Sequence, residues 1–252
     1  MVYQVNSAQK ISGEIKVPGD KSISHRSLIL SSIAEGESKI EGLLEAEDCL
    51  STMGIMRDLG IEITKEDKGK YTVQGKGLTG LKEADDVLDC GNSGTSMRLL
   101  AGLLASQDFY SVLTGDHSLR KRPMQRIIGP LSKMGARIWS RQDGLAPLSI
   151  KGQKLESMEY RLPVASAQLK SSILLASLKT EAETVIIEPA VSRDHTERML
   201  QGAGVDLEIK DDRIILKEAA KRKLNPFKIK VPGDISSCIN CILFVFRVLT
   251  GS

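Results

Sequence analysis

One pattern occurs three times along this chain of 252 residues: a short strand, a turn of small residues, a helix with an apolar stripe, a strand, a second helix and two strands. In each first helix, a small residue precedes a cation by one helical turn. These pairs are Ser22 and Arg26, Gly94 and Arg98, and Ser166 and Lys170. The repeat restricts the chain to folds in which three like units pack against one another.

Each predicted unit closes in the same way, because its second helix ends at a glycine before the chain reverses. These glycines are Gly60, Gly135 and Gly204. Apart from the short strand that begins each unit, the strands that we expect include residues 38–44, 71–74, 109–114, 148–151, 184–188 and 213–216. The unit is therefore βαβαββ, and the fold class is α/β (α+β). We expect strands outside and helices inside, with three helix N-termini in similar positions.

A fourth copy begins near the end of the chain and does not continue. Residues 230–234 repeat residues 16–20, Lys-Val-Pro-Gly-Asp, letter for letter. The tail from 235 to 252 differs in composition, since it holds two of the four Cys and two of the four Phe. We interpret this as a chain that ends early, with a reading frame that shifts after Ser237.

The first helix opening is rich in groups that attract anions. Residues 16–27 run from a strand through a Pro-Gly turn into a helix that starts with Lys21 and Ser22. Free backbone N–H groups and the helix dipole favour an anion there. Ser22 and Arg26 share a helical face, as do Lys21 and His25. The segment alone is equally compatible with a phosphate or carboxylate pocket and with a capped helix whose charges are solvated.

Composition narrows the ligand class. The net charge of +3 is too small to indicate nucleic-acid binding, and aromatic residues, at 4%, poorly supply a base-stacking surface. Small anionic metabolites fit better. The four cysteines show no metal-site pairing beyond Cys238-x-x-Cys241, so we expect no metal site. No secretory signal precedes the repeat, and no apolar run reaches the roughly 18 residues of a membrane span. We expect a cytoplasmic protein.

Five motifs, in order, resemble those of the 5-enolpyruvylshikimate-3-phosphate synthase family (3-phosphoshikimate 1-carboxyvinyltransferase). They are residues 17–26, 89–98, 121–124, 165–171 and 192–197, and the resemblance covers residues 1 to about 237. It implies an enolpyruvyl transferase-like inverse α/β barrel, in a monomeric two-domain protein of six such units. Residues 19–233 would form the shikimate-phosphate-binding domain of three units, and residues 1–18 and 234–252 would be remnants of the second domain.

The resemblance also implies the reaction and its residues. The family joins the enolpyruvyl group of phosphoenolpyruvate to the 5-hydroxyl of shikimate-3-phosphate and releases phosphate, with no metal or organic cofactor. Lys21 and Arg122 would be catalytic, with Lys21 touching both substrates. The residues that would bind shikimate-3-phosphate are Ser22, Arg26, Ser166, Gln168 and Arg193. Those that would bind phosphoenolpyruvate are Asn92, Gly94 and Arg122, with Gln168 reaching it too.

Several neighbouring side chains have two open interpretations. His25 is either packed or a ligand contact, and Arg98 points either into the site or into a structural pairing. Arg120 and Lys121 are compatible with a solvated face. The carboxylates at strand-to-helix junctions are expected to cap helices rather than act as bases. These are Asp48, Asp89, Asp116 and Asp194.

Two other functions remain to be weighed. The enolpyruvyl transferase that acts on UDP-N-acetylglucosamine shares the fold, but it carries a reactive cysteine before the Arg-Pro pair, and residues 115–122 contain none. A non-catalytic anion-binding fragment is the second alternative. In the family the acid and base groups come from the other domain. We therefore expect this chain to bind shikimate-3-phosphate but to have lost turnover.

Overall fold

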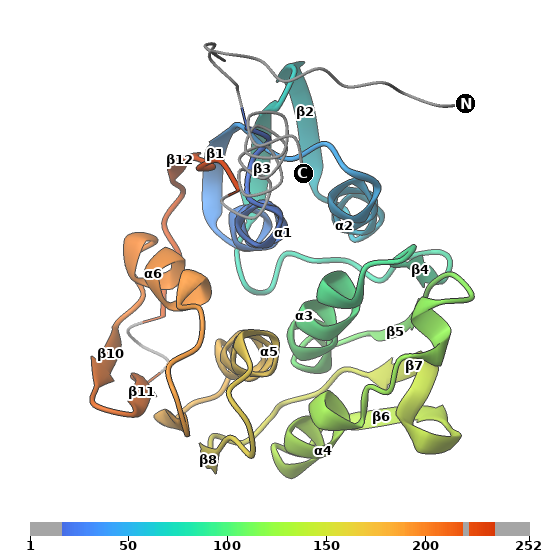
Figure 1. The fold of residues 1–252 in the computed structure, drawn as a ribbon, viewed down its shortest axis with the longest axis vertical. Helices are drawn as coiled ribbons and strands as arrows, with labels where there is room; N and C mark the ends of the chain where they lie inside the picture. The colour runs from blue at the N-terminus through green and yellow to red at the C-terminus, as the bar shows by residue number, and fades with distance from the viewer. Residues whose placement is uncertain (1–16, 219–221, 235–252) are drawn as a thin grey trace, which may run out of the picture.

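The computed structural model describes residues 17–218 and 222–234 (Figure 1). Lys16, Ser237, the tail to residue 252 and the Cys238–Cys241 pair lie outside the described residues. Cys49 and Cys90 are buried free thiols. None of the helices in the described part of the chain is both long and apolar enough to cross a membrane.

Three successive units make up the described chain. The first contains α1 (Lys21–Ser32), β1 (Glu35–Glu41), α2 (Glu47–Asp58), β2 (Glu62–Asp67) and β3 (Lys70–Lys76). The second contains β4 (Leu88–Asp89), α3 (Gly94–Ala105), β5 (Tyr110–Thr114), η1 (Leu119–Lys121), α4 (Gln125–Lys133), β6 (Arg137–Arg141), η2 (Gln142–Gly144) and β7 (Leu145–Lys151). The third contains β8 (Glu159–Arg161), α5 (Ala167–Ser177), β9 (Thr184–Ile187), α6 (His195–Gly202), β10 (Leu207–Lys210) and β11 (Arg213–Leu216), and β12 (Lys228–Lys230) follows it.

The strands form three four-stranded sheets, one for each unit, and the three sheets have the same topology. Their strand orders are β12-β1-β3-β2, β4-β5-β7-β6 and β8-β9-β11-β10. The first pair in each order is parallel and the other two pairs are antiparallel. The predicted βαβαββ repeat is confirmed.

The first sheet departs from the expected chain order. A strand was expected at residues 16 and 17, but Val17 is not in a strand. The parallel partner of β1 is β12, which pairs Lys228 with Lys39 and Lys230 with Glu41. The start of the apparent fourth copy therefore completes the first unit, because the ring of three units brings the end of the third beside the first.

Helices occupy the centre of the molecule and sheets lie around them (Figure 1). The three first helices are buried on almost every side, which is the behaviour of core helices. Several of their buried serines donate hydrogen bonds to the carbonyl one turn earlier, as Ser27 does to Ile23 and Ser177 to Ile173. At Gly102 an added Cβ would lie 2.1 Å from the carbonyl oxygen of Ser172, so α3 and α5 approach closely there.

The predicted helix ends are also confirmed. Gly60, Gly135 and Gly204 have φ values of 87°, 94° and 88°, in the left-handed region that a residue with a Cβ enters at a cost.

The two copies of Val-Pro-Gly-Asp lie against each other. Gly19 and Gly233 form an antiparallel bridge. The amide of Asp20 donates to the carbonyl of Pro232 at 2.8 Å, and the amide of Asp234 donates to that of Pro18 at 2.9 Å. The identical segments thus exchange equivalent hydrogen bonds about a local twofold axis.

Candidate functional site

The first helices α1, α3 and α5 begin with a side-chain cap. The oxygens of Asp20, Ser93 and Ser166 accept hydrogen bonds from backbone amides three residues later, at 2.8, 3.1 and 3.3 Å. These caps fix the first turns, from which the predicted ligand-binding side chains project.

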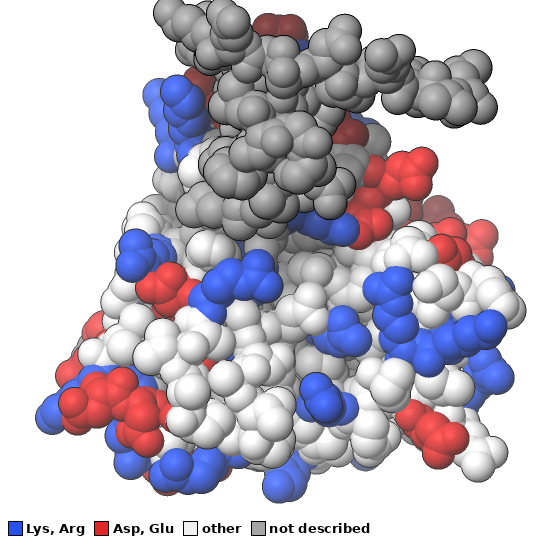
Figure 2. Space-filling model, in the orientation of Figure 1, with Lys and Arg blue, Asp and Glu red and all other residues white. Residues whose placement is uncertain are grey.

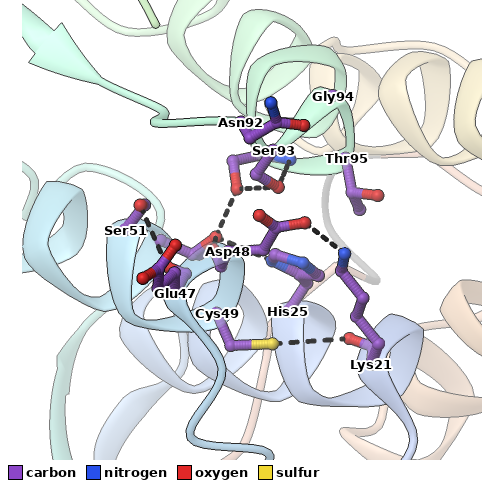
Figure 3. A network of polar contacts seen from close by, with 12 residues as sticks. Lys21, His25, Glu47, Asp48, Cys49, Ser51, Asn92, Ser93, Gly94 and Thr95 are labelled. Carbon is purple, nitrogen blue, oxygen red and sulfur yellow. Dashed lines mark hydrogen bonds and ion pairs between the residues drawn. The ribbon is translucent and has the colours of Figure 1, made fainter. Parts of the chain in front are cut away.

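Lys21 forms an ion pair with Asp48 at the start of α2 (Figure 3). The lysine side chain is 49% exposed and the aspartate 19%. The prediction that Asp48 caps α2 is wrong, because Ala46 is the N-cap and Asp48 lies in the first turn. Its carboxylate turns instead to the ammonium of Lys21, which leaves that cation at the mouth of the site.

Arg26 is buried, and its guanidinium donates to four oxygen atoms of three residues, on α1, α5 and α6. Its Nη1 donates to the hydroxyl of Ser22 at 2.7 Å and to its carbonyl at 3.1 Å. Nη2 donates to Ser171 at 2.7 Å, and Nε donates to Thr196 at 2.6 Å. Burial, above all, lowers the pKa of Arg26 to about 10. The shared face of Ser22 and Arg26 is present, and the guanidinium extends it to α5 and α6.

His25 is packed in the interior. Its Nδ1 lies 2.8 Å from the hydroxyl of Thr52, and a chain of hydrogen bonds continues from Thr52 through Ser96 to Ser93. Burial is the main cause that lowers the pKa of His25 to about 4. His25 therefore joins α1, α2 and α3 from inside, while Lys21, on the same face, reaches solvent.

Asn92 holds the predicted phosphoenolpyruvate residues together. Its Oδ1 and its carbonyl accept hydrogen bonds from Arg122, and its Nδ2 donates to Asp116 at 2.6 Å. Asp116 also caps the backbone amide of Leu119 at 2.7 Å. Hydrogen bonds from this amide and from Asn92 hold the pKa of Asp116 below its usual value.

Gly94 faces two guanidinium groups. A Cβ added at Gly94 would lie 2.7 Å from Nη1 of Arg98 and 3.4 Å from Nη1 of Arg122. Arg126, in the first turn of α4, completes what we call the arginine cluster (Arg98, Arg122 and Arg126). The space beside Gly94 is therefore bordered by positive charge.

The arginine cluster forms no ion pair with a carboxylate of the described residues. The arginines that form ion pairs in the described part of the chain are others, Arg161, Arg198 and Arg213. Burial lowers the pKa of Arg98, and the charges of Arg122 and Arg126 lower it further. Figure 2 shows blue side chains over the ends of α3 and α4 in the middle of the visible face. Such a cluster favours binding of a phosphate or carboxylate.

Pro123 lies before α4 and not in its first turn. The N-cap of α4 is Met124 and the helix starts at Gln125. Arg122 is extended, as expected for a residue before proline, after the 3₁₀ turn η1. Because its backbone is extended, Arg122 directs its guanidinium back towards Asn92.

Gln168 connects α5 to α3. Its Oε1 accepts a hydrogen bond from Arg98 at 2.9 Å, and its Nε2 donates to the hydroxyl of Thr95 at 2.9 Å. Ser166, the N-cap of α5, is half-buried. Arg98 is thus bonded to a predicted ligand-binding residue, an arrangement that fits both of its open interpretations.

The third repeated cation, Lys170, is neutralised. It is buried between Glu188 at 2.7 Å and Glu197 at 2.5 Å. Glu188 also accepts a hydrogen bond from Ser192 at 2.6 Å. These contacts fix the segment between β9 and α6, which carries the exposed Arg193.

Arg193 lies two residues before α6, which starts at His195. Its charge lowers the pKa of Arg26, so the two guanidinium groups are near each other. Of the remaining carboxylates, Asp194 pairs with Arg198, and Asp89 accepts from the amide of Gly91.

Sequence reasoning missed several partners of the predicted residues. They are Ser171, Thr196, Thr95 and Arg126. Arg126 had a readable signal, since it follows Arg122 by four residues. Ser171, Thr196 and Thr95 lie inside the motifs that carry the family resemblance, but no local spacing pairs them with Arg26 or Gln168, because they lie far along the chain from those residues.

Comparison with known proteins gives one family. The family model for EPSP synthase (3-phosphoshikimate 1-carboxyvinyltransferase) matches residues 5–247. A 3-phosphoshikimate 1-carboxyvinyltransferase of Magnetococcus marinus is 55% identical over 232 residues, 92% of this chain and 52% of that protein. One from Citrifermentans bemidjiense is 53% identical over 236 residues, 93% and 54% of the two proteins.

Solved structures agree with the sequence relatives. The EPSP synthase from Acinetobacter baumannii superposes with a TM-score of 0.88 at 48% identity, over 93% of this chain and 53% of that one. The chain spans about half the length of the curated relatives it matches.

Proposed function

The chain belongs to the EPSP synthase family, and on that premise we propose that it binds shikimate-3-phosphate at the N-terminal ends of α1, α3 and α5. The observation that carries this proposal is the buried guanidinium of Arg26, which joins Ser22 on α1 to α5 and α6 and lies near the charge of Arg193. The arginine cluster beside Gly94, which forms no ion pair with a carboxylate among the described residues, suits the second anion, phosphoenolpyruvate. A planar guanidinium binds phosphate and carboxylate oxygens in pairs.

Shikimate-3-phosphate would contact five residues from α1, α5 and the segment before α6. Their mutual bonds and charges support this assignment. Arg26 binds the hydroxyl of Ser22, and the charge of Arg193 reaches Arg26. The five residues are Ser22, Arg26, Ser166, Gln168 and Arg193.

Phosphoenolpyruvate would lie beside Gly94, held by Arg122 and Asn92. Lys21 would neutralise charge on both substrates while the shikimate 5-hydroxyl oxygen bonds to the enolpyruvyl carbon and phosphate leaves. Asp48 must release Lys21, at least in part, when an anion binds there. Lys21 and Arg122 are therefore the residues to which we assign catalytic roles.

Binding without turnover is the behaviour we propose for this chain alone. The described carboxylates near the site are engaged as caps or ion-pair partners. A non-catalytic anion-binding fragment describes the same physical behaviour. The UDP-N-acetylglucosamine transferase is disfavoured by the absence of cysteine in residues 115–122.

Calorimetry with shikimate-3-phosphate tests the proposal. The chain should bind it, and Arg193→Gln should weaken binding roughly ten- to a hundredfold, the usual cost of a lost charged hydrogen bond. Arg161→Gln, at an exposed arginine on β8, is the matched control and should bind as the parent does. No heat of binding by the parent chain would refute the assignment.

Turnover is tested in a full-length counterpart by phosphate release. Lys21→Ala or Arg122→Ala should abolish it while the melting temperature stays unchanged. Near-normal turnover in either variant would show that the assignment of that residue is wrong.

We also propose the domain boundaries at residues 19 and 233, with the remaining ends belonging to a second domain, and a cytoplasmic, monomeric full-length protein. The bridge between Gly19 and Gly233 supports these boundaries, since it brings both ends of the three units to one point. Sedimentation and cell fractionation of the full-length form test the other two statements.

A further inference from the structure

The amide of Gln168 is held at both ends, but its two partners differ in chemistry. Arg98 donates to Oε1 at 2.9 Å, and Nε2 donates to the hydroxyl of Thr95 at 2.9 Å. A hydroxyl both donates and accepts, so Thr95 bonds equally well to either end of the amide. A guanidinium only donates. Arg98 alone therefore decides which end of the amide faces which way.

The orientation matters because the two ends of an amide present opposite polarity. With Oε1 turned to Arg98, the NH₂ group faces Thr95. The bond to Thr95 uses one of its two hydrogens, which leaves the second as a donor for an anionic oxygen. The reversed amide would present its oxygen and repel a phosphate or carboxylate.

The same arrangement occurs at a second amide of the site. Arg122 donates to Oδ1 of Asn92, and Nδ2 of Asn92 donates to Asp116. There a donor-only and an acceptor-only partner fix the amide twice. At Gln168 the second partner is the hydroxyl of Thr95, which can donate or accept. The orientation of this amide therefore depends on Arg98.

The equivalent cations of the other units have no such partner. Arg26 donates to hydroxyls and carbonyls, and Lys170 binds two carboxylates. None of these partner groups is a side-chain amide, with a donor end and an acceptor end that must be told apart. Arg98 carries no carboxylate among the described residues, so its position is not explained by charge pairing.

We propose that Arg98 is a positioning residue that fixes the side-chain amide of Gln168 with its NH₂ group available to the bound anion. This inference rests on the proposed function for the identity of the anion, but not for the orientation of the amide. Arg98 acts through Gln168.

The orientation is tested without ligand by the ¹H–¹⁵N spectrum of the chain, in which Gln168→Leu identifies the Gln168 amide pair. Arg98→Met should shift this pair and increase its hydrogen exchange at least severalfold. Arg98→Lys, which keeps a donor-only cation, should retain more of the parent pattern. Arg126→Met, the matched control, removes a guanidinium of the arginine cluster that does not touch Gln168 and should leave the pair unchanged.

The consequence is tested by calorimetry with shikimate-3-phosphate in a double-mutant cycle. Arg98→Met and Gln168→Leu should each weaken binding roughly tenfold, and the double variant should be no weaker than Gln168→Leu alone by more than about twofold. Arg126→Met should add its effect independently. An unchanged amide pair in Arg98→Met, or additive losses for Arg98 and Gln168, would overturn the proposal. If the parent chain bound no shikimate-3-phosphate, the proposed function would fail, while the amide spectrum would still decide the orientation.

Discussion

His25 is a titratable side chain held neutral in the interior. It is fully buried in α1, and its Nε2 has no hydrogen-bond partner among the described residues. Burial and the charge of Lys21 lower its pKa from 6.5 to about 4, against the opposing charge of Asp48. A protonated imidazole is therefore unfavourable in the folded state, although the unfolded chain accepts the proton at a higher pH.

Stability should fall as pH falls from 6.5 towards 4, since the unfolded chain binds a proton that folded His25 does not. The depressed pKa corresponds to a loss of about 2 to 3 kcal/mol of unfolding free energy by pH 4.5. Urea denaturation of the parent and of His25→Asn at pH 7 and 4.5 measures this. The pH-dependent loss should be smaller in the variant by that amount, and equal losses would contradict the assignment.

The three first helices show how elements are cross-linked at their N-terminal ends. Arg26 joins α1 to α5 and α6, and Arg98 joins α3 to α5. Lys170 joins α5 to α6 through Glu197. The first two units use this position to contact the third unit, whereas Lys170 stays within the third unit, where two carboxylates neutralise it.

Lys170→Met should reduce the unfolding free energy by about 3 to 5 kcal/mol, because it leaves Glu188 and Glu197 in the interior without a cation. Burial already raises the pKa of Glu197. The measurement is urea denaturation at pH 7. Lys154→Met, in the exposed pair with Glu181, is the control and should leave the unfolding free energy nearly unchanged.

Equal losses in the two lysine variants would show that the buried pair does not stabilise the link between α5 and α6. If Lys170→Met failed to fold, adding Glu197→Gln should restore folding, since it removes one of the uncompensated charges.

At the scale of the whole molecule, the two identical Val-Pro-Gly-Asp segments meet and close the ring of three units. Gly19 and Gly233 pair, and a Cβ at Gly19 would lie 2.0 Å from the carbonyl oxygen of Gly42. The obstacle is backbone, which a side-chain rotation does not relieve. The start of α1, β12 and the turn after β1 therefore depend on one small residue.

Gly19→Ala should lower the unfolding free energy by about 1 to 3 kcal/mol through overpacking. Gly129→Ala is the control of opposite sign, because nothing lies within 4 Å of its added Cβ in α4. It should stabilise the protein by about 0.5 to 1 kcal/mol, the usual gain of alanine over glycine in a helix. Thermal unfolding compares the two, and a stable Gly19→Ala would show that the bridge tolerates a wider separation.

Structural features that depend only on residues close together in the chain could be predicted from the sequence. The three first helices, the glycines that end the second helices and the final strand at residues 213–216 all follow from local periodicity and capping. So does the contact of Ser22 with Arg26, which one helical turn places on one face. Their common physical reason is that helical and turn geometry is fixed within a few residues.

Contacts between distant segments were decided only by the packing of three units around one centre. β12 joins the sheet of the first unit, Asp48 pairs with Lys21 instead of capping α2, and Arg98 bonds to Gln168, 70 residues away. Serines are buried in α1 and α5, and several of their hydroxyls, such as those of Ser27 and Ser177, are satisfied by the helix itself. Sequence by itself determined the repeated unit and the anion-binding residue types. The tertiary structure decided which of those residues share a site, because long-range contacts depend on how the units close into a ring rather than on local spacing.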